Sequence, residues 1–290
     1  MRSMSSFSSF STTTYSSKGI AAIVGVGPKL GRSIAHKFAH EGYTVAILSR
    51  DLGKAHKRSH LTRNYLFLPP CGFHAGRLSR LAEEIAREEK AQVFAIRIDC
   101  SDTRSIKEAF EGVLSLGFVK VLVYNAAYQP SSLHPANLID IPVSSFEKSL
   151  AVSSVGAFHC AQQVLPGMVE RGRGTILFTG CSASLSGMSG FSELCCGKFA
   201  LRGLSQCLAR EFQPLGVHVA HVIIDSLVGA PRLPSSSLRS AAGEQQGGGG
   251  GDGLMDPDAI AQTYWHLHIQ DRSAWTQEID LRPSTPFRFF

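Results

Sequence analysis

Closely spaced glycines near the start of the chain have the pattern of a turn that holds a phosphate group. The segment Gly25-Val-Gly27-Pro-Lys-Leu30-Gly31 lies between an apolar run and a stretch of helical periodicity, which predicts a strand–turn–helix unit. Glycines let the backbone turn tightly and approach a pyrophosphate, and the first helical amides offer donors and partial positive charge. We assign Gly25, Gly27, Leu30 and Gly31 to a dinucleotide site. The alternative is a tight structural turn without a ligand.

Arg50 ends the second predicted strand, at the position that distinguishes the two nicotinamide cofactors. An acid there accepts a hydrogen bond from the ribose hydroxyl of NAD, whereas an arginine pairs with the 2′-phosphate of NADP. The sequence therefore favours NADP(H) over NAD(H). Asp51 follows directly and weakens that choice, and the alternative is a surface arginine at a strand end.

Apolar runs alternate with segments of helical periodicity along most of the chain. Strands are predicted over Ile20–Val24, Thr44–Ser49, Val93–Ile98, Val119–Tyr124, Thr175–Phe178, Val217–Ile224 and Trp275–Leu281. Asp256 and Pro257 are typical of the N-cap and first turn of a last helix. This alternation predicts an α/β fold with a doubly wound parallel sheet of about seven strands and helices on both faces.

Three segments lack this alternation of strand and helix patterns. Residues 1–18 are Ser/Thr-rich, and we interpret them as a disordered tail or, alternatively, a transit peptide. Residues 54–76 are basic, contain a Pro-Pro pair and form an insertion, while 234–253 is a low-complexity segment that we expect to be flexible. The remainder, 19–290, is predicted to be one dinucleotide-binding domain. We expect a cytoplasmic protein, with a plastid or mitochondrion as the alternative.

Charge, hydropathy and cysteine count argue against several other classes of protein. The net charge of +6 comes entirely from residues 1–18 and 54–76, so a nucleic-acid-binding surface on the folded body is not expected. No apolar run approaches the length of about 20 residues that a membrane span needs. Seven cysteines without a C-x-x-C pair match neither a disulfide framework nor a metal site. We predict Cys100, Cys160 and Cys207 to be small core residues in a reducing compartment.

Several motifs occur in the order seen in one family. The glycine turn is followed by Asp99 after the third strand, by Asn125-Ala126-Ala127 after the fourth, and by Gly197-Lys198-Phe-Ala at a helix start. Over about residues 19–53 and 77–283 the chain resembles short-chain dehydrogenases/reductases. The resemblance implies that Asp99 contacts adenine and that Asn125 and Ala126 support the cofactor, with Ala127 replacing the usual glycine.

The family's catalytic residues are retained only in part. The resemblance implies an Asn–Ser–Tyr–Lys set, in which tyrosine is the general acid/base, lysine lowers its pKa and holds the ribose, and serine polarises the carbonyl. Lys198 matches the lysine, whereas Ser153, Cys181 and Leu194 stand at the asparagine, serine and tyrosine positions. A leucine exchanges no proton, so the usual mechanism cannot operate unchanged.

These replacements leave two functions open. One is an NADP(H)-dependent oxidoreductase with weak or altered activity on a small carbonyl or alcohol, in which Tyr128 is a candidate substitute donor and Ser182 or Ser184 takes the serine's place. The other is a pseudoenzyme that binds NADP(H) as a redox sensor or scaffold, with Lys198 kept as a ribose contact or helix-start cation. Family members associate through two long helices, so a homodimer or homotetramer through about residues 155–170 and 198–213 is expected.

Removing residues 54–76 would join Arg50–Gly53 to the next helix as the family does. We therefore interpret this stretch as an aberrantly retained or flexible segment, and the alternative is a genuine family-specific loop.

Overall fold

The computed structural model describes residues 18–50, 76–128, 137–230 and 254–284. Apart from Lys18 and Gly76, the predicted tail, insertion and low-complexity segment all lie outside these described residues.

Seven parallel strands form one sheet in the order β3-β2-β1-β4-β5-β6-β7. The strands are β1 Ile20–Val24, β2 Thr44–Ser49, β3 Val93–Arg97, β4 Val119–Tyr124, β5 Gly174–Cys181, β6 Val217–Ile224 and β7 Glu278–Leu281. Ala22 of β1 pairs with Ala46 of β2 on one side and Leu122 of β4 on the other. The strand order therefore reverses beside β1. In open α/β sheets, ligands bind at the carboxyl ends of the strands at this switch point.

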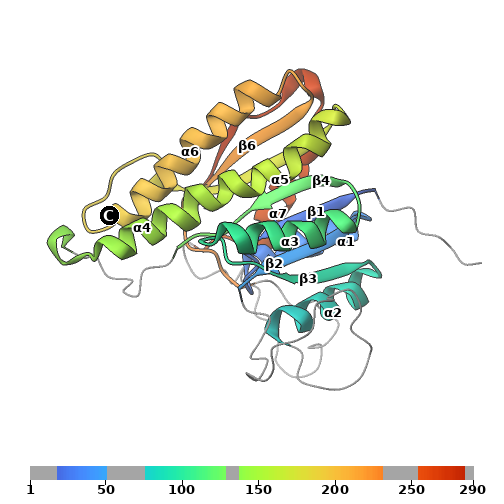
Figure 1. The fold of residues 1–290 in the computed structure, drawn as a ribbon, viewed down its shortest axis with the longest axis horizontal. Coiled ribbons are helices and arrows are strands. Elements are labelled where there is room, and N and C mark those ends of the chain that lie inside the picture. The colour runs from blue at the N-terminus through green and yellow to red at the C-terminus, as the bar shows by residue number, and fades with distance from the viewer. Residues whose placement is uncertain (1–17, 51–75, 129–136, 231–253, 285–290) are drawn as a thin grey trace, which may run out of the picture.

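Helices cover both faces of the sheet (Figure 1), which confirms the predicted architecture. The first face carries α1 Leu30–His40, α2 Arg77–Glu89 and α7 Pro257–His268, and the second carries α3 Thr103–Ser115, α5 Gly156–Glu170 and α6 Ser192–Phe212. Each face has its own apolar core, because strands buried on both sides present alternate residues to the two layers. The Asp256 side chain accepts from the Asp258 amide, so it caps α7 as predicted.

A short helix that the sequence did not predict precedes α5. Helix α4 spans Val143–Leu150 and continues through a π-helical turn, Ala151–Val155, directly into α5. Such turns insert one residue into the helical repeat and are frequent at functional sites. This turn contains Ser153. Three short 3₁₀ turns, Leu138–Asp140, Ser182–Ser184 and Arg272–Ala274, complete the assigned elements.

The cysteines only partly follow the prediction. Cys100 and Cys160 are buried, but Cys207 is exposed, so the prediction that it belongs to the core was wrong. It lies on the solvent side of α6, whose buried stripe runs through Leu201, Ser205 and Leu208 instead. Of the helices in the described parts of the chain, none has the length and apolarity that crossing a membrane requires.

Candidate functional site: a dinucleotide crevice with an altered catalytic set

The three glycines of the turn after β1 have different structural roles. Gly25 has φ +87°, and a Cβ there would lie 2.4 Å from the Ala126 amide nitrogen. At Gly31 a Cβ would lie 2.8 Å from the Val26 Cα, so this glycine lets α1 pack against the turn. At Gly27 a Cβ would meet no atom of the described residues within 4 Å. Gly25 and Gly31 are therefore needed by the fold, whereas Gly27 leaves open space.

Residues from β4 hold this turn in place. The Asn125 side chain donates through Nδ2 to the Gly25 carbonyl oxygen at 2.9 Å, and its amide donates to the Val24 carbonyl at 2.8 Å. Leu30 is buried at the first position of α1, so its side chain anchors the helix start rather than facing the crevice. The predicted cofactor residues Gly25, Gly27, Asn125 and the neighbouring Ala126 thus meet at the switch point.

A pocket of about 650 Å³ opens beside Gly27 at the carboxyl ends of β1 and β2. Three arginines line it: Arg32 from the first turn of α1, and Arg77 and Arg80 from the first turn of α2. Glu84 of α2 is also part of the wall and pairs with Arg32, which leaves Arg77 and Arg80 as the arginines without a carboxylate partner among the described residues of this wall. None of the three arginines was predicted. The insertion separates Arg77 and Arg80 from β2 in the sequence, and Arg32, directly after the glycine turn, was not singled out. The spacing of Arg77 and Arg80 at a helix start was the signal available. The pocket can therefore bind an anion.

Arg50 and Asp99 lie at the neighbouring strand ends. Arg50 is exposed and is not part of the pocket wall formed by the other arginines. Hydrogen bonds from the Ser101 hydroxyl and amide to Asp99 Oδ1, at 2.7 and 3.0 Å, hold the pKa of that carboxyl below its usual value. The positive charge of Arg50 acts in the same direction. Asp99 is therefore an ionised acceptor at the end of β3.

Lys198 is buried beneath the carboxyl end of β5. Its Nζ donates to the Thr179 carbonyl oxygen at 2.8 Å, and burial lowers the pKa of the amine. Nearby Cys181 opposes that shift. The predicted pair of Lys198 and Cys181 is thus brought together. A lysine held this way has one hydrogen bond to the sheet and further protons for a ligand.

Cys181 takes part in a reciprocal cap of the 3₁₀ turn that follows β5. Its sulfur accepts from the Ser184 amide, while its own amide donates to Ser184 Oγ at 3.3 Å. Ser184 is fully buried by this arrangement. Its hydroxyl therefore accepts a hydrogen bond within the turn and retains its own proton, and the hypothesis that Ser184 replaces the serine stays a prediction. Ser182 is half-buried on the same turn.

Ser153 and Leu194 complete the set of altered positions. Ser153 is buried on the π turn, and its Oγ has no hydrogen-bond partner among the described residues. A Cβ at Gly197 would lie 2.9 Å from the Ser153 Cβ, so α6 crosses the π turn in close contact. Leu194 is half-buried in the first turn of α6. Ser153 therefore lies against α6 beside Gly197, the residue that precedes Lys198, and Leu194 lies one turn before Lys198 on the same helix.

A buried polar group behind Lys198 was not predicted. His221 of β6 donates through Nδ1 to Glu278 Oε2 at 3.0 Å, and Arg202 of α6 donates to both oxygens of that carboxylate at 2.7 Å. Burial lowers the pKa of His221, against the opposing effect of Glu278. A Cβ at Gly180 would lie 2.2 Å from His221 Nε2, so the imidazole fits only over a glycine.

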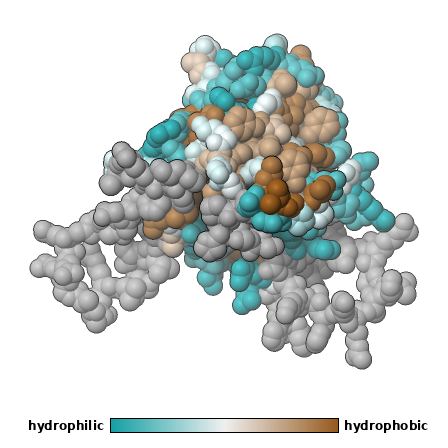
Figure 2. Space-filling view, turned by 90° about the vertical axis from the view of Figure 1, so that its left-hand side faces the viewer, coloured by the Kyte–Doolittle hydropathy of each residue, from teal (hydrophilic) through white to brown (hydrophobic). Residues whose placement is uncertain are grey.

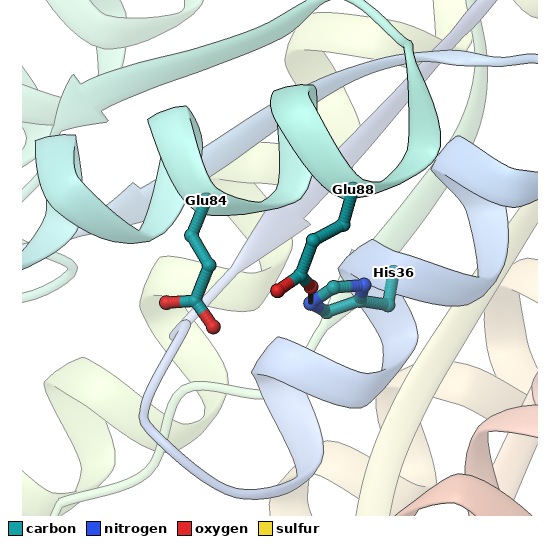
Figure 3. A group of neighbouring side chains, drawn as sticks. All are labelled: His36, Glu84 and Glu88. Carbon is teal, nitrogen blue, oxygen red and sulfur yellow. Dashed lines mark ion pairs between the residues drawn. The ribbon is translucent and has the colours of Figure 1, made fainter. Parts of the chain in front are cut away.

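A cluster of acids and histidine lies between α1 and α2, next to the arginine-lined pocket (Figure 3). His36, Glu84 and Glu88 bring potential metal-ligand atoms within 4.8 Å of one another. Arg32 pairs with Glu84, and the two ring nitrogens of His36 lie 3.4 Å from Glu88 and 3.3 Å from Glu89. These carboxylates already face cationic or protonatable partners. We therefore describe the group as an ion-pair network that joins the two helices.

Comparison with known proteins agrees with this geometry. The family model described as short chain dehydrogenase matches residues 52–227, so the chain belongs to the short-chain dehydrogenase family. The glycine turn precedes the matched range, and its role rests on its own geometry.

Individual relatives cover most of the chain. Sorbitol-6-phosphate 2-dehydrogenase of Escherichia coli is 26% identical over 219 residues, which is 74% of each chain. A short-chain dehydrogenase from Rhodopseudomonas palustris superposes with a TM-score of 0.69 at 26% identity, covering 91% of this chain and 98% of that one. An alcohol dehydrogenase from Thermococcus sibiricus, complexed with 5-hydroxy-NADP, gives a TM-score of 0.71 at 21% identity, covering 94% and 99%. The last likeness supports the fold alone.

Proposed function

We propose that the chain binds NADP(H) in the crevice at the carboxyl ends of β1 and β4 and uses it to interconvert a carbonyl and an alcohol. The observation that carries this proposal is the open space at Gly27, directly beside the first amides of α1 and the arginine-lined pocket. Because Gly27 has no Cβ, an anion can approach the backbone there and accept hydrogen bonds from the first amides of α1. Asn125 keeps the turn open, and Asp99 is available as an acceptor for the adenine end.

The arginines favour NADP(H) over NAD(H). Arg77 and Arg80 lie in the first turn of α2, so their side chains and the helix N-terminus act on the same pocket. Arg32 adds a third guanidinium that already pairs with Glu84. Guanidinium groups bind phosphate through paired, charge-assisted hydrogen bonds. The 2′-phosphate is the group that distinguishes the two cofactors, and Arg50 contributes long-range positive charge from outside the pocket wall.

Lys198 supplies the retained part of the catalytic site. Bound nicotinamide would supply or accept the hydride. We infer that the Lys198 amine holds the adjoining ribose; its hydrogen bond to the Thr179 carbonyl and its burial support this role. Cys181 and Ser153 replace stronger hydrogen-bonding groups, so we expect slower turnover than in a protein with the full set. Sorbitol-6-phosphate 2-dehydrogenase is one relative that acts on a small alcohol, which is consistent with this substrate class.

The test of hydride transfer is NADPH oxidation by the purified chain over a broad panel of aldehydes and ketones. Turnover of one substrate, with loss of activity in Lys198→Met and retention in Lys107→Met on α3, supports the proposal. Binding of NADPH without turnover of any substrate contradicts it. That result would instead favour a cofactor-binding pseudoenzyme, the second candidate, which the leucine at position 194 supports.

A second proposal concerns assembly. Phe158 of α5 and Phe199 of α6 are 41% and 42% exposed, and they lie on the two helices expected to form the subunit contact. Hydrophobic side chains also gather on the face where α4 and the start of α6 lie (Figure 2). Exposed apolar patches mark association surfaces, and we propose a second copy of this chain as the partner. Phe158→Ser with Phe199→Ser should lower the mass measured by light scattering, whereas Ile269→Ser should not. An unchanged mass would contradict the proposal.

A further inference from the structure

A chain of hydroxyl groups runs from the carboxyl end of β4 to the first turn of α6. Tyr128 lies four residues after the end of β4, and its Oη is 2.9 Å from Ser145 Oγ on α4. Ser145 Oγ in turn donates to Glu193 Oε1. Glu193 directly precedes Leu194, the position at which the resemblance places the family's tyrosine. These hydroxyl groups therefore connect a phenol that follows the carboxyl end of β4 to a carboxylate that directly precedes Leu194.

The direction of these hydrogen bonds follows from counting protons. A serine hydroxyl has a single proton, and here Ser145 gives it to Glu193. Ser145 can then only accept from Tyr128, so the phenol donates. All three groups thus form one continuous donor series that ends on the carboxylate. This series can relay a proton from Tyr128 to Glu193 by two small displacements, one along each hydrogen bond.

The burial of the Glu193 carboxylate favours its hydrogen bond to Ser145. Its side chain is 7% exposed, whereas Tyr128 and Ser145 are half-buried. A buried carboxylate is costly unless it is hydrogen-bonded. The Ser149 hydroxyl donates to the Glu193 backbone oxygen at 2.8 Å and holds the residue against α4. Glu193 is therefore fixed in place, and its accessible connection to the crevice runs through Ser145 and Tyr128.

The geometry points to Tyr128 as the general acid/base of this chain, with Ser145 and Glu193 relaying its proton. This inference rests on the proposed hydride transfer. In alcohol oxidation, the C–H hydride leaves to the nicotinamide and the alcohol proton passes to the Tyr128 oxygen. The phenol proton passes to Ser145, and the Ser145 proton passes to the Glu193 carboxylate, which becomes a carboxylic acid. Carbonyl reduction runs in the opposite direction and starts from Glu193 that has first taken up a proton from solvent. Tyr128 then gives its proton to the carbonyl oxygen, Ser145 gives its proton to Tyr128, and Glu193 gives its proton to Ser145 and returns to the carboxylate.

The relay is tested first without turnover. In protein labelled with [¹³Cζ]tyrosine, the Tyr128 resonance is identified by its loss in Tyr128→Phe. We expect this resonance to shift in Ser145→Ala and in Glu193→Gln, and to stay in place in Ser144→Ala, a control at an exposed neighbouring serine. A Tyr128 resonance that does not move in Glu193→Gln overturns the relay, whatever the protein's activity.

The catalytic role is tested next, on a substrate that the wild type reduces. We expect Tyr128→Phe to lower kcat by about 10²–10⁴-fold. Ser145→Ala and Glu193→Gln should lower kcat and alter its pH dependence. Ser145→Thr, which keeps a hydroxyl at this position, should have a kcat close to that of the wild type. Full activity of Tyr128→Phe overturns the inference and leaves the proposed function intact. A wild type that binds NADPH without turnover contradicts the proposed function, and with it the catalytic role of Tyr128.

Discussion

Replacing Gly27 with alanine separates a ligand-binding glycine from a structural one. The added methyl would meet no atom of the described residues within 4 Å, and Gly27 does not have a positive φ. We therefore expect the melting temperature to change by no more than about 2 °C, because such a substitution alters stability by roughly 0.4–1 kcal/mol. The methyl would occupy the space assigned to the pyrophosphate. Loss of one hydrogen bond to a charged group costs about 1.5–3 kcal/mol, which is a weakening of roughly 10- to 150-fold.

Gly31→Ala is the matched control. Its methyl would lie 2.8 Å from the Val26 Cα, a backbone atom that cannot move without shifting the turn. Overpacking of this kind costs about 1–3 kcal/mol, so we expect the melting temperature to fall by roughly 2–5 °C. Both variants are compared by thermal denaturation and by fluorescence titration with NADPH. Wild-type NADPH affinity in Gly27→Ala would refute the assignment of this glycine to the cofactor.

Three further predictions concern stability and cofactor choice. Burial lowers the pKa of His268 to about 4, so below pH 6.5 the unfolded chain takes up a proton that the folded chain does not. Stability should then fall by up to about 3 kcal/mol between pH 6.5 and 4, and urea titrations should show a smaller fall in His268→Gln. Gly180→Ala should be strongly destabilising alone and much less so combined with His221→Ala, since the clash needs both side chains; additive melting temperatures would argue against that contact. Arg77→Ala should weaken NADPH binding more than NADH binding, and an equal loss for both would remove Arg77 from the 2′-phosphate site.

The strands were the most predictable part of the fold. The bounds of β1, β2, β4 and β6 match the prediction, because strands buried on both faces appear as continuous apolar runs. β7 was predicted from Trp275 but begins at Glu278, at the sheet edge where burial is incomplete. Helix α4 was missed because it is only eight residues long and Ser-rich, although Val143, Phe146 and Leu150 have helical spacing. Its position against α6 is a tertiary property.

The site residues likewise fall into those that a local sequence pattern predicts and those that it does not. The glycine turn was predicted because its role is local to one strand–turn–helix unit, whereas Asn125, which bonds Gly25 from 100 residues away, was predicted only through the family resemblance. The relay through Tyr128, Ser145 and Glu193 joins residues 17 and 48 positions apart, so no local pattern contains it. The relay was missed, whereas the burial of Cys207 was predicted and was wrong. An apolar neighbourhood in sequence did not determine which side of α6 faced the core.

The most direct test of the account is a fluorescence titration of the purified full-length chain with NADPH and, in parallel, with NADH. The account predicts saturable binding of both with a clear preference for NADPH, because three arginines surround the pocket beside Gly27. Equal affinity would contradict the assignment of that pocket to the 2′-phosphate. Absence of binding for either cofactor would contradict the central claim that this crevice is a working dinucleotide site.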